Sequence, residues 1–360
     1  VLVLVLVSSP AHANPDLRWR TLETEHFYVH YHAGEEEAAN RVAMVAERAY
    51  ERLTLAYGHR VFLKIHVTLT DPQDTANGRA TASPYPFMVL YATAPEPLSV
   101  LEAYDDWIDI LVTHELVHIV HLDTVHGIPR LVNAVLGFGV LGKVTQPNIV
   151  QPRWVVEGVA TMDESEFSSQ GRRRSAQFDA YIRMAVLEGQ FQTLDQVSSI
   201  ARVWPHGSSI YLYGVHFMHY IAARYGRDKL RELSHLYGGQ VVPFGINKAI
   251  KDVLGVSFYE LWNEFREDTV RRFQAQARRI RRRGLRQGRR LTFSGETTRY
   301  PFWSPDDAWI HFYKDDQHAV RSLRGDEGIK RIRPTGGRIR EGRGIGRQGV
   351  DVDVEHVIDV

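Results

Sequence analysis

Residues 114–123 read "HELVHIVHLD" and place two imidazoles and a carboxylate in the order H-E-x-x-H. On a helix, residues i and i+4 share a face, so His114 and His118 can both direct a ring nitrogen at one cation. Glu115 lies beside that face, where a carboxylate can take a proton from a water molecule that the cation activates. These residue types at this spacing predict a metal site with hydrolytic chemistry.

The segment that carries the motif, "DDWIDILVTHELVHIVHLD", contains neither Gly nor Pro and predicts a helix over residues 105–122. Apolar residues flank the motif nearly all round, which is typical of a buried helix. Burying Glu115 between two histidines would be costly unless a cation compensated its charge. This cost favours a metal site over the alternative, a zinc-free core helix that is rich in histidine.

Catalytic zinc usually has three protein ligands, and the chain offers three candidates for the third. His121 continues the same helix, but one straight helix does not easily bring three rings to one tetrahedral ion. His126 sits in a loop, where the longer pattern H-E-x-x-H-x-x-G-x-x-H is not met. Glu157 lies on a second expected helix, 152–165, whose Gly158 is small enough for a close approach to the first helix. We favour Glu157 as the third ligand of a Zn²⁺ ion, with His121 packed or at the edge of a cleft.

The composition narrows the chemistry further. The 360 residues include no cysteine, which excludes disulfides, thiolate zinc sites and a cysteine nucleophile. The net charge of +1 is unevenly distributed, because residues 271–290 hold ten arginines and no acid. The net charge of all other residues is therefore 1 − 10 = −9. We expect a solvated helix end and linker there, with peripheral contact to a membrane or the cell envelope as the alternative. No nucleic-acid partner is expected, since the stretch has no aromatic residue except Phe273 and no binding motif.

The N-terminal residues resemble the end of a secretory signal. Residues 1–7 alternate Val and Leu, and "AHA" supplies an A-x-A cleavage pattern that ends at Ala13. A buried β-strand is the alternative reading of the Val/Leu alternation. We expect residues 1–13 to be a signal-peptide remnant and the protein to be exported to the bacterial periplasm or cell surface.

Hydrophobic periodicity and turn residues predict an α+β fold. Strands are expected over 25–32, 62–70 and 87–92, and an amphipathic helix over 35–58. After residue 105 the pattern is helical almost throughout, with helices expected over 105–122, 152–165, 175–189, 207–225, 228–237, 244–254 and 257–283. We therefore expect a small N-terminal sheet lobe (14–122) with the H-E-x-x-H helix packed on it, followed by a mostly α-helical lobe (123–285).

Two further segments have a distinct character. Residues 128–150 are apolar, and core packing, a lid over a bound peptide and docking to a membrane are all consistent with them. Residues 286–321 are expected to form a linker and a pair of short strands around a turn. Beyond these, residues 322–360 are rich in Gly and Arg with little to bury, and we expect them to be disordered.

"HELVH" followed by "WVVEGVA" resembles the gluzincin arrangement of zinc peptidases, in which a Glu on a downstream helix completes a His-His-Glu site. More closely, residues from about 25 to 285 resemble the bacterial peptidase-MA-like domains, through "TANGRA", "YDDWIDILVTHELVHIVHLD", "QPRWVVEGVATMDES" and "IYLYGVHFMHYIAARYG". In aminopeptidase-N-like relatives a Tyr three residues before a Gly stabilises the oxyanion. Tyr211 stands in that place, with Tyr213 and His206 as reserves; the alternative for Tyr211 is a core aromatic.

Two features depart from the pattern of these relatives. Their Gly-Ala-Met-Glu-Asn strand, which holds a substrate amine, is absent, and "GRATASPYPFMVLYA" stands in its place. This favours endopeptidase over aminopeptidase activity and leaves an edge strand that can pair with an extended peptide. "PFWSPDDAWIHF" resembles the repeat of TolB-type β-propellers, with Asp307 where Gly is usual, but only one partial blade is present.

We therefore expect an exported zinc-dependent peptidase that acts on peptide or protein substrates. His114, His118 and Glu157 are the expected ligands, Glu115 the general base and Tyr211 the oxyanion donor. The alternative from another class is a non-catalytic binding or assembly module with a structural metal site. The presence of Glu115 argues against this alternative, because a structural site needs no general base.

Overall fold

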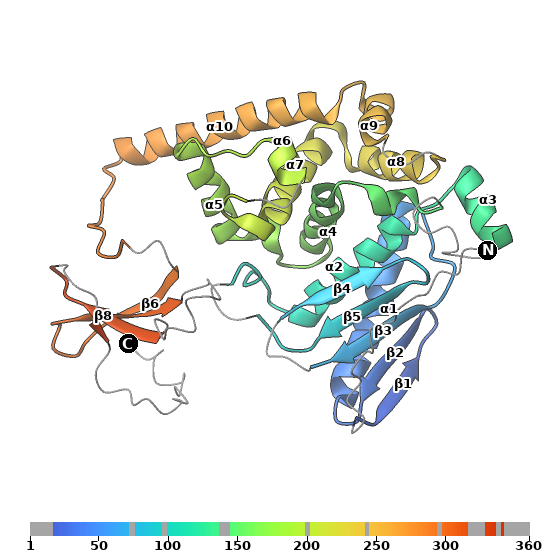
Figure 1. The fold of residues 1–360 in the computed structure, drawn as a ribbon, viewed down its shortest axis with the longest axis horizontal. Coiled ribbons are helices and arrows are strands. Elements are labelled where there is room, and N and C mark those ends of the chain that lie inside the picture. The colour runs from blue at the N-terminus through green and yellow to red at the C-terminus, as the bar shows by residue number, and fades with distance from the viewer. Residues whose placement is uncertain are drawn as a thin grey trace, which may run out of the picture. The chain divides into compact units, whose positions relative to one another are not determined.

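The computed structural model describes residues 17–71, 76–95, 99–136, 145–198, 202–241, 245–293, 297–315, 328–335 and 340–341. The chain forms two compact units, Val1–Arg279 and Ile280–Val360, and Figure 1 shows the elements of each. The expected signal remnant, residues 1–13, lies outside the described residues. Within the described residues, no helix is both long enough and apolar enough to cross a bilayer.

The first unit begins with a five-stranded mixed sheet in the order β1-β2-β3-β5-β4. The two outer pairs, β1 with β2 and β4 with β5, are antiparallel, whereas β2, β3 and β5 run parallel. The bounds are β1 Trp19–Glu23, β2 Phe27–His32, β3 Ile65–Thr70, β4 Gly78–Thr81 and β5 Phe87–Tyr91. Three of these strands were expected, and the two that were not, β1 and β4, are the edges of the sheet.

Helices α1 (Glu36–Tyr57) and α2 (Trp107–Leu122) pack on one face of this sheet. The inward residues of the strands alternate with half-buried ones, as in the fully buried Ile65, Val67 and Leu69 of β3. Asp106 caps α2 by accepting a hydrogen bond from the Asp109 backbone N–H. The H-E-x-x-H helix therefore lies between the sheet and the helices that follow, as expected.

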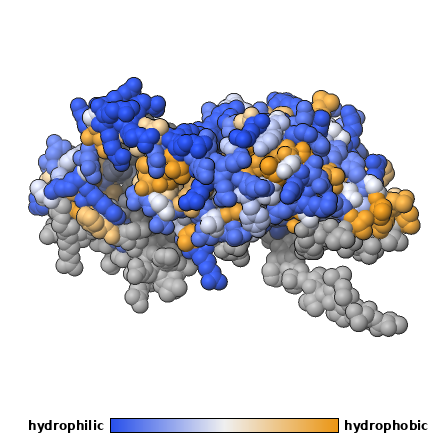
Figure 2. All heavy atoms as spheres, turned by 90° about the horizontal axis from the view of Figure 1, so that it is seen from above, coloured by the Kyte–Doolittle hydropathy of each residue, from blue (hydrophilic) through white to orange (hydrophobic). Residues whose placement is uncertain are grey.

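The rest of the first unit is mostly helical, and six of its helices match the expected ranges to within about two residues at each end. They are α4 Arg153–Phe167, α5 Ala176–Leu187, α7 Ser209–Tyr225, α8 Arg227–Gly238, α9 Ile246–Leu254 and α10 Phe258–Arg282. Two further helices, α3 (Gly127–Leu136) and α6 (Leu194–Ser198), were not expected. An aromatic cluster joins α4, α7 and α10, with Trp154, Phe217 and Trp262 in mutual ring contact. On the face that Figure 2 shows, most described side chains are hydrophilic, and hydrophobic clusters lie between them.

The basic stretch 271–290 lies mainly on α10 and the residues after it. Its described arginines are exposed, and Arg271 pairs with Glu267 and Asp268 of the same helix. This exposure agrees with the expected solvated helix end and linker. Contact of residues 271–290 with a membrane stays a prediction.

The second unit contains a four-stranded antiparallel sheet, β6 Thr297–Trp303, β7 Ile310–Asp315, β8 Gly328–Ile332 and β9 Arg340–Glu341. The expected strand pair is present, and Asp307 in its turn has a φ of 53°, the left-handed conformation that favours glycine. The expectation of disorder from residue 322 is wrong for β8 and β9. Strand β8 pairs with β7, and the guanidinium groups of Arg331 and Arg333 stack on the Trp309 ring. These contacts stabilise a segment that has few aliphatic residues to bury.

Candidate metal centre

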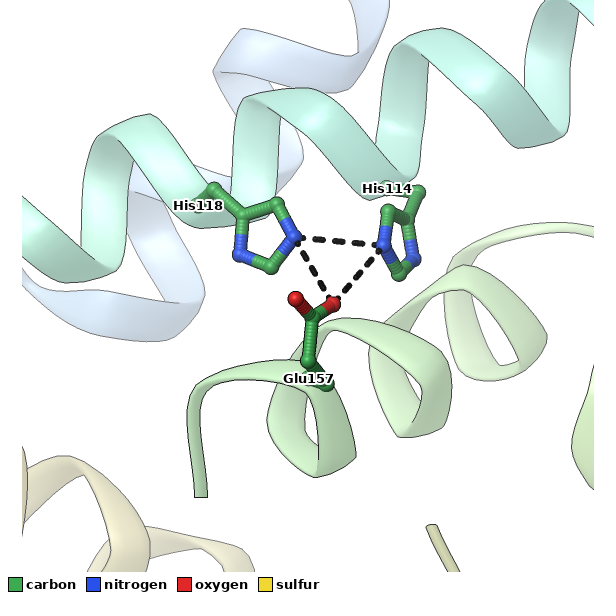
Figure 3. A group of neighbouring side chains, drawn as sticks. All are labelled: His114, His118 and Glu157. Carbon is green, nitrogen blue, oxygen red and sulfur yellow. Dashed lines mark hydrogen bonds and ion pairs between the residues drawn. The ribbon is translucent and has the colours of Figure 1, made fainter. Parts of the chain in front are cut away.

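Three side chains from two helices converge on one point, as Figure 3 shows. His114 and His118 lie one turn apart on α2, and their Nε2 atoms are 3.2 Å from each other. Glu157 approaches from α4, with its Oε2 atom 3.3 Å from Nε2 of His118 and 3.6 Å from Nε2 of His114. A search of the described residues for three or more His, Asp or Glu side chains whose donor atoms lie within 4.8 Å of one another finds these three.

The spacing of the three donor atoms fits a tetrahedral cation. Bonds of about 2.0–2.1 Å at the tetrahedral angle would separate neighbouring donors by about 3.3–3.4 Å. The observed separations of 3.2, 3.3 and 3.6 Å bracket this value. The two histidines are buried, and only 13 % of the Glu157 side chain is exposed, so the group forms a shielded site. The sequence-predicted ligands His114, His118 and Glu157 are thus brought together, in a geometry that is compatible with a metal ion.

A crossing of α4 with α7 positions Glu157. A Cβ added to Gly158 would lie 2.6 Å from the carbonyl carbon of Gly214, so the two helix backbones are in direct contact there. We expected Gly158 to allow a close approach of α4 to the H-E-x-x-H helix. This expectation is wrong, because Gly158 faces α7 instead. Glu157 precedes this contact and turns from it toward α2.

Glu164 and Arg172 support His114 from behind, and neither was expected from the sequence. The Glu164 Oε2 atom lies 2.8 Å from Nδ1 of His114 and accepts a hydrogen bond from the Nδ1–H, which leaves Nε2 free to bind a cation. Arg172 donates from its backbone N–H, Nε and Nη2 to the Glu164 carboxylate at 2.6–2.9 Å. His118 has no such support, because its buried Nδ1 has no hydrogen-bond partner among the described residues.

The electrostatics of the site favour a positive charge at its centre. Burial and the Arg172 charge lower the pKa of His114, but hydrogen bonds to Glu157 and Glu164 outweigh them and raise it to about 9. Burial raises the pKa of Glu157, but the His118 charge and hydrogen bonds to both histidines hold it well below its usual range. Despite burial, Arg172 lowers the pKa of Glu164 to about 2. Two ionised carboxylates thus surround the imidazoles, and a cation can replace the proton that they stabilise.

Glu115 is buried beside the ligands and lines a cavity. Burial raises the pKa of its carboxyl group, against the opposing effect of the two ligand histidines. Gly78, at the start of β4, leaves room for it, since a Cβ there would lie 2.7 Å from the Glu115 Oε1 atom. The cavity has a volume of about 190 Å³, and its lining includes Asn77, Gly78, Leu101, Trp107, Leu111, His114, Glu115, Arg172 and Tyr211.

Tyr211 lines the same cavity. Its ring centroid is 6.5 Å from that of His114, and the Arg172 guanidinium lies 4.8 Å from its centre. Burial and the Glu157 charge raise the pKa of its hydroxyl to about 12, so the hydroxyl is protonated at neutral pH and can donate a hydrogen bond. The structure therefore places the Tyr211 ring at the cavity near His114, and the role of its hydroxyl as an oxyanion donor stays a prediction.

The reserve and alternative residues lie elsewhere. Tyr213 is a core aromatic whose hydroxyl accepts a hydrogen bond from the Gln192 backbone N–H at 3.2 Å, and His206 is exposed in a turn. The buried His121 contacts Gln151 and Ser234 at 2.9 and 2.7 Å through its two ring nitrogens. His126 stacks on His235. Neither His121 nor His126 belongs to the ligand group, and His121 is packed as expected.

No protein-family model matches the chain, and a search of the curated proteins finds no match. The function of the site therefore has to be inferred from its geometry.

Proposed function

We propose that this chain is a zinc-dependent peptidase in which Glu115 acts as the general base. The observation that carries the proposal is the His114–His118–Glu157 triangle with the buried Glu115 next to His114 at the cavity. A set of two imidazoles and one carboxylate is a common ligand set of catalytic zinc and leaves a position for water or substrate. A Zn²⁺ ion held there would polarise a substrate carbonyl and lower the pKa of a water molecule.

The chain's own groups then supply the proton transfers. Glu115 takes a proton from the attacking water and delivers it to the leaving amine, which requires it to be ionised at the start of the cycle. The nearby positive charge of an occupied site opposes the effect of burial on its pKa. The Tyr211 hydroxyl donates a hydrogen bond to the carbonyl oxygen as negative charge develops on it. Glu164 and Arg172 hold the His114 ring in orientation throughout.

The surroundings of the site support an endopeptidase. Strand β4 is an edge of the sheet, and its start lies against Glu115. An edge strand can hydrogen-bond an extended peptide along its backbone, and an internal stretch of a substrate can do this as well as a terminus. The lining residues Leu101, Trp107 and Leu111 give part of the cavity an apolar wall suited to a side chain of such a peptide.

The test is cleavage of a mixed peptide library by the zinc-loaded chain and by Glu115→Gln. The amide keeps the size of the side chain but cannot take a proton, so Glu115→Gln should retain zinc and lose turnover by about 100-fold or more. The matched control is Glu51→Gln, at an exposed position of α1, which should cleave as the wild type does. Full activity of Glu115→Gln contradicts the assignment. Zinc binding without cleavage of any peptide by the wild type would favour the non-catalytic module.

Export is a separate part of the proposal. Its support is the A-x-A pattern that ends at Ala13. Recovery of the expressed chain in the periplasmic or surface fraction, and its loss from that fraction when residues 1–13 are deleted, would test it. Accumulation of both forms in the cytoplasm would contradict it.

A further inference from the structure

Helix α3 presents a row of apolar side chains to solvent. Ile128, Leu131 and Val135 are spaced by three and four residues, so they share a face, and they are 59 %, 64 % and 73 % exposed. The opposite side of α3 is anchored, because Asn133 is buried and donates a hydrogen bond to the Thr145 carbonyl at 3.0 Å. The apolar row therefore belongs to an ordered helix.

An exposed apolar residue from another segment lies close to α3. Phe62, in the connection between α1 and β3, is 79 % exposed. Phe62 and α3 line one cavity of about 570 Å³, whose walls are His59, Arg60, Val61, Phe62, Asp123, Val125, Arg130, Asn133 and Ala134. The apolar row itself lies outside this cavity, on the adjoining face of α3. Exposed residues of the two segments are here termed the α3 patch, which consists of Arg60, Phe62, Ile128, Arg130, Leu131 and Val135. Figure 1 shows α3 at the periphery of the helical elements, and a hydrophobic cluster lies on the same side in Figure 2.

The charges of the α3 patch are all positive. Arg60 and Arg130 are exposed at the cavity, and the cavity's one acid, Asp123, is buried and paired with His59 at 2.8 Å. Apolar side chains beside arginines match a bilayer surface, where acyl chains accept the former and phosphates the latter. Arginine suits this role because its guanidinium binds phosphate while its stem covers apolar surface.

We infer that the α3 patch docks the protein peripherally onto an anionic lipid bilayer. The row on α3 and Phe62 enter the boundary between headgroups and acyl chains, while Arg60 and Arg130 contact lipid phosphates. This inference goes beyond the proposed peptidase function and does not depend on it. It also assigns membrane contact to a different part of the chain from the arginines of 271–290.

The test is co-sedimentation of the full chain with vesicles of equal parts phosphatidylcholine and phosphatidylglycerol. The wild type should bind these vesicles better than pure phosphatidylcholine, and less well as salt rises. Ile128→Ser with Leu131→Ser should weaken partitioning by about tenfold, because binding scales with the buried apolar area. The matched control, Met184→Ser with Leu187→Ser, changes an exposed pair at the same spacing on α5 and should bind as the wild type does.

A position-specific probe makes the result independent of folding defects. The chain has no cysteine, so Leu131→Cys can carry a single environment-sensitive dye, with Met184→Cys as the control. Vesicles should shift the emission of the dye at position 131 to the blue and leave the dye at position 184 unchanged. No vesicle binding, or self-association through the patch in place of it, would overturn the inference. The inference would also be overturned if the chain bound vesicles while the emission of the dye at position 131 stayed unshifted, and if replacing Arg281, Arg282 and Arg283 by Gln abolished this binding.

Discussion

Gly158 of α4 and Gly214 of α7 lie in direct backbone contact. A Cβ on Gly158 would stand 2.6 Å from the Gly214 carbonyl carbon, and a Cβ on Gly214 would stand 2.7 Å from the Trp154 carbonyl oxygen. Glu157 immediately precedes one glycine, and Tyr211 lies three residues before the other. The crossing therefore fixes how far Glu157 stands from Tyr211, which lines the cavity.

Gly214→Ala should separate α4 from α7 and destabilise the protein. The added methyl group meets backbone atoms, which cannot rotate away, so we expect a loss of about 1–3 kcal/mol in the free energy of unfolding. Urea denaturation measures this loss. Gly207→Ala is the control, because a Cβ at Gly207 has no heavy atom within 4 Å. Equal unfolding free energies for Gly214→Ala and the wild type would contradict the close contact.

Glu164→Gln should weaken metal binding although Glu164 is not a ligand. The carboxylate orients His114 and keeps its Nδ1 protonated, and loss of such support typically lowers metal affinity about 10–100-fold. Competition with a chromogenic chelator measures the affinity, after circular dichroism has confirmed that the variant is folded. Glu166→Gln changes a carboxylate on the same helix that pairs with Arg227 and should leave the affinity unchanged. Unaltered affinity of Glu164→Gln would show that the His114 ring needs no such partner.

Tyr211→Phe should lower kcat, whereas Tyr213→Phe should lower stability and keep kcat. If Tyr211 donates to the developing oxyanion, its loss should lower kcat about 100-fold and leave KM nearly unchanged. Tyr213→Phe should keep kcat but lower the free energy of unfolding by about 1 kcal/mol, since the Gln192 backbone N–H loses its acceptor. Peptide kinetics and urea denaturation of both variants measure these effects. A Tyr211→Phe variant with the wild-type kcat would make Tyr211 a packing residue.

His121 should make stability depend on pH without contributing to metal binding. Burial, partly offset by the Gln151 hydrogen bond, lowers the pKa of His121 from 6.5 to about 4. Between these values the unfolded chain binds a proton that the folded chain does not, so this contribution to stability is lost as the pH falls. His121→Asn removes that titration, and its unfolding free energy should fall less than that of the wild type between about pH 7 and about pH 5. Zinc loss in His121→Asn would instead indicate that His121 is a ligand.

The periodic elements could be predicted from the sequence because their own residues are buried. Strand β3 alternates buried and half-buried residues, and α2 is buried around nearly its whole circumference. The two strands that were missed, β1 and β4, are the edges of the sheet. The residues of β1 are mostly exposed, and β4 begins with a glycine in a polar segment, so pairing with a neighbour stabilises both more than their own burial does.

The same distinction applies to the site. His114, Glu115 and His118 share one helix, so their spacing alone predicted their proximity. Glu164 was predictable in principle, because it lies seven residues, or about two turns, after Glu157 on the same face of α4. Arg172 was not, because it follows the end of α4 and reaches Glu164 through a turn whose path depends on tertiary packing.

Metal content tests the central claim most directly. We predict about one zinc ion per chain in the purified wild type by plasma mass spectrometry, as a site with three protein ligands requires. His118→Ala and Glu157→Ala should each lose most of this zinc, whereas His121→Asn should keep it. Absence of zinc from the wild type after incubation with excess ion, or full zinc in Glu157→Ala, would contradict the proposed His-His-Glu centre.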